Sequence, residues 1–169
     1  MTVPVRSSVR TRHPVGEVLD LLTSERWVQV KAARFGDGSR VVRREALPGG
    51  GLLLAVSREL PEGAPGFLTR LLPEDGRVVQ TDEWAPDDGS GTRSGTWRVE
   101  LAGAPARLGG TMRVEPDGAG SSYLVVGETK VSVPLVGRKA ESFIAEMVGR
   151  LGVREGELLQ MTLAQTGSS

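Results

Sequence analysis

The segment that decides the fold lies near the C-terminal end, where residues 135–165 read LVGRKAESFIAEMVGRLGVREGELLQMTLAQ. When these residues are laid out at 100° per residue, apolar side chains gather on one side and charged side chains on the other. The apolar side contains Ala140, Ile144, Met147, Val148, Leu151, Leu158 and Thr162, and the opposite side contains Lys139, Ser142, Glu146, Arg150 and Glu157. The spacing therefore predicts one amphipathic helix of about 25 residues.

Two glycines interrupt this predicted helix. Gly152 and Gly156 each cost about 1 kcal/mol relative to alanine in a helix interior. We therefore expect the helix to depend on packing against the rest of the chain. A long apolar stripe needs an apolar surface to cover, and the remaining residues must supply it.

The rest of the chain reads mainly as strands separated by turns. Residues 3–11 alternate between apolar and polar side chains, as a half-buried strand does. Pro14 then precedes residues with helical spacing, and Thr23 or Ser24 is placed to cap a second short helix through Val30 with Trp27 as its buried anchor. The further predicted strands are 40–47, 52–60, 77–84, 96–101, 110–115 and 123–133.

About seven strands at short spacing favour an antiparallel meander over a parallel α/β sheet. A strongly twisted antiparallel sheet can curve around a long helix. The predicted fold class is therefore α+β, a helix-grip arrangement with a curved sheet, two short helices after the first strand and a long C-terminal helix. Residues 61–72 are less regular, and Phe67, Leu68, Leu71 and Leu72 could form a short helix or an apolar flap.

Length and composition restrict the class of protein. A chain of 169 residues suits one domain, which we place at 1–165 with a frayed tail at 166–169. Its 21 basic and 21 acidic residues balance, which argues against a dedicated nucleic-acid binder. It has no cysteine, so disulfides and thiolate metal sites are excluded. No apolar run approaches the roughly 20 residues of a membrane span, and we expect a cytoplasmic protein, monomeric or homodimeric, with no integral membrane association.

The order of strand, two short helices, six strands and long helix resembles the helix-grip fold of the START-like superfamily, also called SRPBCC. Four short segments add to the resemblance: TDEW at 81–84, GTWRVE at 95–100, GGTMRV at 109–114 and VSVPLVG at 131–137. Within that superfamily the chain resembles a bacterial family of unknown function. The resemblance implies a deep, largely apolar pocket between the sheet and the last helix. It implies no single reaction, because the superfamily includes carriers, cyclases, hydrolases and co-chaperone domains.

Glu155 is the first candidate site residue, because it falls within the apolar stripe of the C-terminal helix. A carboxylate that faces a dry pocket has its charged form disfavoured and can serve as an acid or as a hydrogen-bond anchor. The alternative is a helix that breaks near Gly152 or Gly156, which would turn Glu155 outward. Asp82 shares a strand face with Trp84, and it matters only if that face points inward.

The indoles of Trp84 and Trp97 lie on neighbouring predicted strands and could line a pocket or simply fill the core. The complete predicted ligand-binding set is Trp84, Trp97, Asp82, Phe143, Ile144, Met147, Leu151, Glu155 and Leu158. His13 is the only histidine, and no HExxH or EF-hand motif is present, so we expect neither a metal nor a cofactor.

Three functions remain open from the sequence. The first is binding of a hydrophobic or amphipathic small molecule such as a lipid, polyketide or isoprenoid. The second is an enzyme of the cyclase or hydrolase kind that uses Glu155 or Asp82 as acid or base. The third is a protein-interaction module that presents the apolar side chains of Phe67, Leu68, Leu71 and Leu72.

Overall fold

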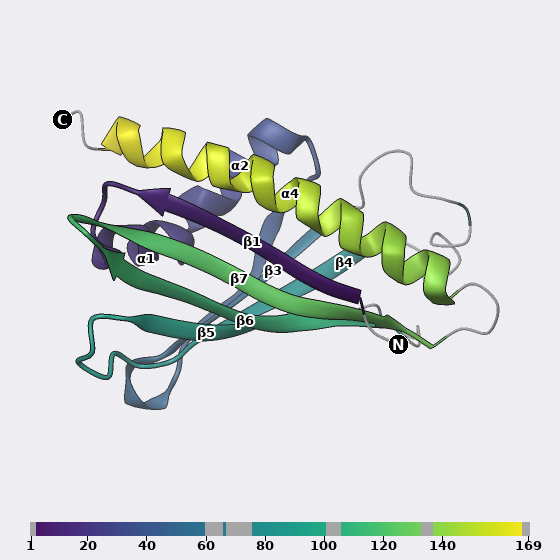
Figure 1. The fold of residues 1–169 in the computed structure, drawn as a ribbon, viewed down its shortest axis with the longest axis horizontal. Coiled ribbons are helices and arrows are strands. Elements are labelled where there is room, and N and C mark those ends of the chain that lie inside the picture. The colour runs from purple at the N-terminus through teal and green to yellow at the C-terminus, as the bar shows by residue number, and fades with distance from the viewer. Residues whose placement is uncertain (1–2, 60–65, 67–75, 101–105, 133–136, 167–169) are drawn as a thin grey trace.

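A seven-stranded antiparallel sheet and a long C-terminal helix dominate the computed structural model, which describes residues 3–59, 66, 76–100, 106–132 and 137–166 (Figure 1). The strands follow the order β1-β7-β6-β5-β4-β3-β2. In chain order the elements are β1 (Val3–Thr11), α1 (Val15–Leu22), α2 (Glu25–Phe35), β2 (Arg40–Ala46), a 3-10 turn (Pro48–Gly50), β3 (Leu52–Glu59), β4 (Arg77–Trp84), β5 (Arg93–Glu100), β6 (Ala106–Asp117), β7 (Gly120–Val131) and α4 (Gly137–Thr166). The predicted α+β helix-grip fold is confirmed.

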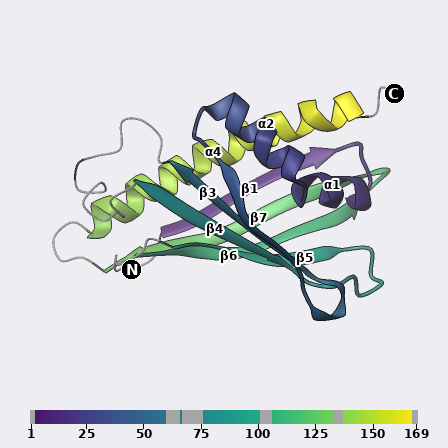
Figure 2. The same cartoon turned by 180° about the vertical axis from the view of Figure 1, so that it is seen from behind.

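The three helices pack on one face of the sheet. α4 lies along β1 and β7, while α1 rests on β6 and β7 and α2 on β2. Figure 2, seen from behind, shows α1 and α2 beside the C-terminal half of α4. The candidate site lies beside the middle of α4, whose residues from Val148 to Leu159 line it.

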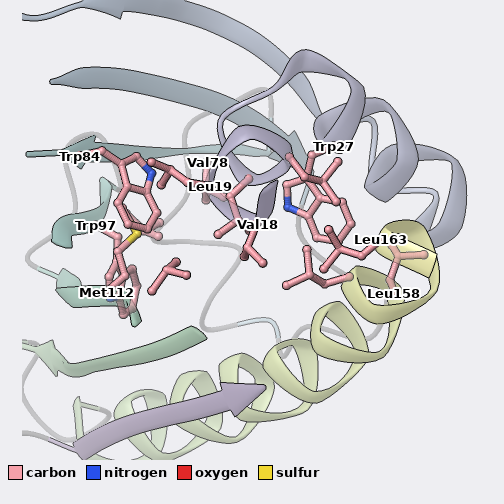
Figure 3. Close-up of a cluster of buried hydrophobic side chains, with 14 residues drawn as sticks. Val18, Leu19, Trp27, Val78, Trp84, Trp97, Met112, Leu158 and Leu163 are labelled. Carbon is pink, nitrogen blue, oxygen red and sulfur yellow. The ribbon is translucent and has the colours of Figure 1, made fainter. Parts of the chain in front are cut away.

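The main core fills the space between the three helices and the sheet. Figure 3 shows Val18 and Leu19 of α1 and Trp27 of α2 between the strand residues and α4. The strands contribute Val78, Trp84, Trp97, Val99, Met112 and Val114, and α4 contributes Leu158, Leu159 and Leu163. Trp27 is therefore the buried anchor of α2, as predicted.

Local capping explains where α2 begins and ends. The Ser24 hydroxyl accepts a hydrogen bond from the backbone N–H of Trp27 at 3.2 Å, so Ser24 rather than Thr23 is the N-cap. α2 continues through Phe35, five residues past the predicted end. It stops at Gly36, whose φ of 65° is the left-handed geometry that glycine adopts without strain.

α4 is a single helix of 30 residues, and it does not break at its glycines. A Cβ atom on Gly152 would lie 2.8 Å from the Ser7 Cβ, and one on Gly156 would lie 2.8 Å from the Val9 Cγ2. The two glycines thus allow the helix backbone to approach β1 closely. The alternative in which the helix breaks and turns Glu155 outward is wrong.

The buried end of α4 holds a carboxylate that the sequence did not suggest. Glu141 is buried, and its Oε1 accepts a hydrogen bond of 2.8 Å from the backbone N–H of Val131. This contact satisfies a donor at the end of β7. Ala140, Ile144, Leu158 and Thr162 are buried as the apolar stripe predicted.

The last strands differ in length from their predicted bounds. β5 begins at Arg93 rather than at 96, β6 covers 106–117, and β7 ends at Val131. β6 and β7 pair up to Asp117 and Gly120, because a tight turn with Gly118 at φ 59° joins them directly. The predicted flap residues Phe67, Leu68, Leu71 and Leu72 lie outside the described residues.

Candidate functional site

Two cavities lie between the sheet and the helices. The first has a volume of about 110 Å³, and its lining includes Trp27 and Lys31 of α2 and Leu159 of α4. The second has a volume of about 120 Å³, and its lining includes Ile144 and Met147 of α4. Six residues line both cavities: Asp37, Arg58, Leu108, Val148, Leu151 and Glu155. A single layer of side chains therefore separates the two spaces.

Strand alternation sets which side chains of β4 reach the first cavity. Gln80, Asp82 and Trp84 occupy alternate positions, and all three line it. Asp82 lies opposite Leu54 of β3 and Trp97 of β5, which line the same cavity. The face that the sequence assigned to Asp82 and Trp84 is thus the inner one.

A chain of polar side chains crosses the first cavity. Arg58 donates from Nη2 to the Gln80 Oε1 at 3.1 Å, and Gln80 donates from Nε2 to the Asp82 Oδ1 at 3.0 Å. The Glu155 Oε1 lies 3.8 Å from the Arg58 Nη1 and 3.9 Å from the Lys31 Nζ. We call Lys31, Arg58, Gln80, Asp82 and Glu155 the polar chain.

The polar chain draws on four separate elements of the fold. Lys31 comes from α2, Arg58 from β3, Gln80 and Asp82 from β4, and Glu155 from α4. The Lys31 ammonium also lies 5.5 Å from the centre of the Trp27 ring, within the range of a cation–π contact. Sequence reasoning missed Lys31 and Arg58. The apolar run LLLAV in β3 conceals the alternation that would have placed Arg58 on the inner face.

Burial raises the pKa of two groups that line the first cavity, Asp82 and Tyr123. Desolvation raises the pKa of Asp82 above its ordinary value, and the Gln80 hydrogen bond and the nearby Lys31 and Arg58 charges only partly oppose it. Desolvation also raises the pKa of Tyr123 well above its usual value, with further contributions from the Asp82 and Glu155 charges. Tyr123 therefore faces the first cavity as a neutral phenol that can donate a hydrogen bond.

The raised pKa of Asp82 predicts a pH dependence of stability. In the unfolded state the Asp82 carboxyl has a pKa near 3.8, and in the folded state its pKa is higher. Above pH 3.8 the folded state therefore binds more protons than the unfolded state. Stability should therefore fall as pH rises from about 4 through the folded pKa. We expect Asp82→Asn to remove this loss. Thermal unfolding should therefore show that the melting temperature of the variant rises relative to that of the wild type between pH 4 and pH 7.

Asp88→Asn is the matched control for this measurement. Asp88 is exposed, and hydrogen bonds from the Ser90 side chain and backbone lower its pKa. Its contribution to stability is present above the unfolded pKa near 3.8 and is lost only as pH falls further, so Asp88→Asn should show no gain on the wild type between pH 4 and pH 7. A parallel trend in both variants would contradict the assignment of a raised pKa to Asp82.

The structure brings most of the predicted ligand-binding residues together. Trp84, Trp97 and Asp82 line the first cavity, Ile144 and Met147 line the second, and Leu151 and Glu155 line both. Whether they contact a ligand stays a prediction.

Two of the predicted residues line neither cavity and lie among buried side chains instead. Leu158 belongs to the main core, and Phe143 packs against Val131, Ala140 and Ile144. Both therefore have a packing role that needs no ligand.

Three further observations concern His13, metal-ligating side chains and helix length. The Nδ1 of His13, just before α1, lies 2.8 Å from the Oε2 of Glu17, and His13 lines neither of the two cavities. Within the described ranges, no group of three or more His, Asp or Glu side chains is arranged to hold a metal ion. No helix among those residues has the length and apolar character needed to cross a membrane.

Comparisons with solved structures show the same fold in other proteins. The protein TTHA0849 from Thermus thermophilus matches with a TM-score of 0.63 at 14% identity, covering 99% of this chain and 100% of that one. The ZhuI aromatase/cyclase from Streptomyces sp. R1128 matches with a TM-score of 0.63 at 12% identity, covering 100% and 98%. A START superfamily protein from Mycobacterium smegmatis matches with a TM-score of 0.57 at 10% identity, covering 96% and 98%.

These low identities establish the fold alone. No significant sequence match to a curated protein was found. The model of one protein family, described as "Protein of unknown function (DUF2505)", matches residues 6–163. The chain therefore belongs to the DUF2505 family, and its fold is that of the START-like, or SRPBCC, superfamily.

Proposed function

We propose that this protein binds a hydrophobic or amphipathic small molecule, of the lipid, polyketide or isoprenoid kind, between the sheet and α4. The observation that carries the proposal is the pair of cavities that meet at the polar chain. Ligand pockets usually have volumes of about 300–1000 Å³. The two cavities together hold about 230 Å³, so a ligand of ordinary size would need both of them and some outward movement of their walls. Rotamer changes of the shared side chains, such as Leu151 and Arg58, would join them.

The lining suits a ligand with one polar end. Burial of its apolar body would contribute about 25 cal/mol per Å² of apolar surface removed from water. The polar chain offers both donors and acceptors, and the neutral phenol of Tyr123 adds a further donor in the same cavity. The likeness to a START superfamily protein and to an aromatase/cyclase supports a ligand-binding role for this fold.

Leu151→Trp is the variant that tests this proposal. Leu151 lies in the wall between the cavities, and an indole there would occupy the space a ligand needs. Loss of about 60 Å² of apolar contact would weaken binding about tenfold. We expect native mass spectrometry to find a co-purified ligand on the wild type and far less on the variant, with a smaller thermal shift from a panel of fatty acids, isoprenoids and aromatic polyketides.

Val153→Trp is the control, because Val153 lies on the same helix with 62% of its surface exposed. It adds the same indole to α4 and should leave binding unchanged. A wild type that purifies without ligand and shows no thermal shift with any compound in the panel would count against a binding role. Equal effects of the two variants would show that the cavities are not the site.

One observation favours an enzyme instead. Asp82 is a carboxyl group in a cavity with a raised pKa, a property shared by many general acids. The same mass spectrometry experiment separates the two functions. A binding protein releases its ligand chemically unchanged. A hydrolase releases a product that has gained water, and a cyclase releases a ring-closed isomer or its dehydrated form, which chromatography separates from the added compound.

A further inference from the structure

One buried side chain of the second cavity carries a polar atom that no contact among the described residues accounts for. Thr129 of β7 is only 1% exposed, and it lines this cavity. Its Oγ1 is buried and has no hydrogen-bond partner among the described residues. Its two cross-strand neighbours, Leu108 of β6 and Val3 of β1, are apolar.

An unpaired buried hydroxyl is unfavourable and uncommon in folded proteins. Strand formation does not require it either, because valine has nearly the same shape and an equal preference for strands. A valine at this position would fill the same space without leaving a polar atom unsatisfied. The hydroxyl of Thr129 therefore makes physical sense if something that enters the cavity forms a hydrogen bond with it.

The register of the sheet places Thr129 at a defined distance from the polar chain. Thr129 pairs with Leu108, Leu108 with Val99, and Val99 with Gln80, so the four side chains form one row across the inner face. Gln80 and Thr129 are thus three strand spacings apart, about 14 Å along the sheet. The two side chains between them are apolar.

We propose that Thr129 is a second polar anchor, which binds a hydroxyl or keto oxygen on the otherwise apolar body of the ligand. This inference rests on the proposed function and narrows the class of ligand. It favours a molecule oxygenated at two points that lie up to about 14 Å apart, one at the polar chain and one at Thr129. It disfavours a simple fatty acid, whose tail has no oxygen to offer in the second cavity.

A single label can report on the second cavity. Ile144 is the one isoleucine of the chain, and it lines this cavity. Labelling the isoleucine δ1 methyl with ¹³C therefore gives one NMR signal that needs no assignment. Two probes of nearly equal shape, cyclohexanone and methylenecyclohexane, differ by the oxygen that Thr129 would bind.

The comparison uses Thr129→Val and Thr129→Ser, with Thr111→Val as a control on an exposed strand position. Thr129→Val should weaken cyclohexanone binding about threefold to tenfold, the loss of one hydrogen bond, and should leave methylenecyclohexane binding unchanged or tighter. Thr129→Ser keeps the hydroxyl and should retain the preference. Thr129→Val should also not lower the melting temperature of the ligand-free protein, because it removes an unpaired group.

The possible outcomes distinguish this inference from the proposed function. If Thr129→Val leaves both probes unchanged, or weakens both equally, the second anchor is wrong while binding in the cavity stands. If the ligand-free variant melts at a lower temperature, the hydroxyl already has a partner and the inference fails. If neither probe shifts the Ile144 signal in the wild type, the cavity admits no ligand and both proposals fall.

Discussion

Replacing Trp97 with alanine should lower the free energy of unfolding by about 3–5 kcal/mol, the usual cost of deleting a buried aromatic side chain. Trp97 is 6% exposed and lies in the main core with Trp84 and Met112 (Figure 3). A Cβ atom on Gly127 would lie 2.6 Å from the Trp97 Cζ2, so the indole fills the space that this glycine leaves. Alanine would leave a void there that neighbouring backbone cannot close.

Chemical denaturation followed by circular dichroism measures this loss of stability. Trp97→Phe separates the contribution of apolar packing from that of the indole hydrogen bond. The Trp97 Nε1 donates a hydrogen bond of 3.1 Å to the backbone oxygen of Val126. Phenylalanine keeps most of the apolar contact but removes this donor, so we expect a loss of about 1–2 kcal/mol. A loss below about 1 kcal/mol for Trp97→Ala would mean that the indole does not pack as described.

Gly156→Ala should destabilise the protein, although alanine is the better helix former by about 1 kcal/mol. The new Cβ would lie 2.8 Å from the Val9 Cγ2, and the β-branched side chain of Val9 has little freedom to move. We expect overpacking to exceed the gain in helix propensity and to lower stability by about 1–3 kcal/mol. Gly156→Val, with a larger side chain, should reach the upper end of that range or exceed it.

Gly149→Ala is the matched control on the same helix. A Cβ atom on Gly149 would meet nothing within 4 Å, so only helix propensity changes there. This variant should therefore raise stability by about 0.5–1 kcal/mol. A denaturation midpoint that falls for Gly156→Ala and rises for Gly149→Ala would confirm that Gly156 is retained for close packing on β1. A stabilised Gly156→Ala variant would contradict that close contact.

Much of the fold could be predicted because its signals are local. Period-two alternation marked the strands, helical periodicity marked α4, and both depend only on residues a few positions apart. The same alternation placed Asp82 and Trp84 on one face, and only the structure shows that this face is the inner one. The strand ends were less accurate, because pairing between β6 and β7 continues to Asp117 and Gly120 whatever the local pattern suggests.

The candidate site could be predicted only in part. The apolar stripe of α4 led to Leu151 and Glu155, since a helical pattern assigns its own inner face. Lys31 and Arg58 could not be found in that way, because their roles depend on contacts with Glu155, which lies far along the chain. Nor could Thr129 be recognised, since an unpaired hydroxyl is defined by what surrounds it.

Local periodicity was enough to predict an antiparallel sheet covered by an amphipathic helix, because burial of apolar side chains selects that arrangement. Tertiary structure decided what individual residues do within it. Gly152 and Gly156 are weak points in a local view of the helix, and in the fold they are the positions where α4 touches β1. The polar chain and the two cavities likewise exist only once α2, β3, β4 and α4 meet, since hydrogen bonds, ion pairs and empty volume depend on distances between segments far apart in the sequence.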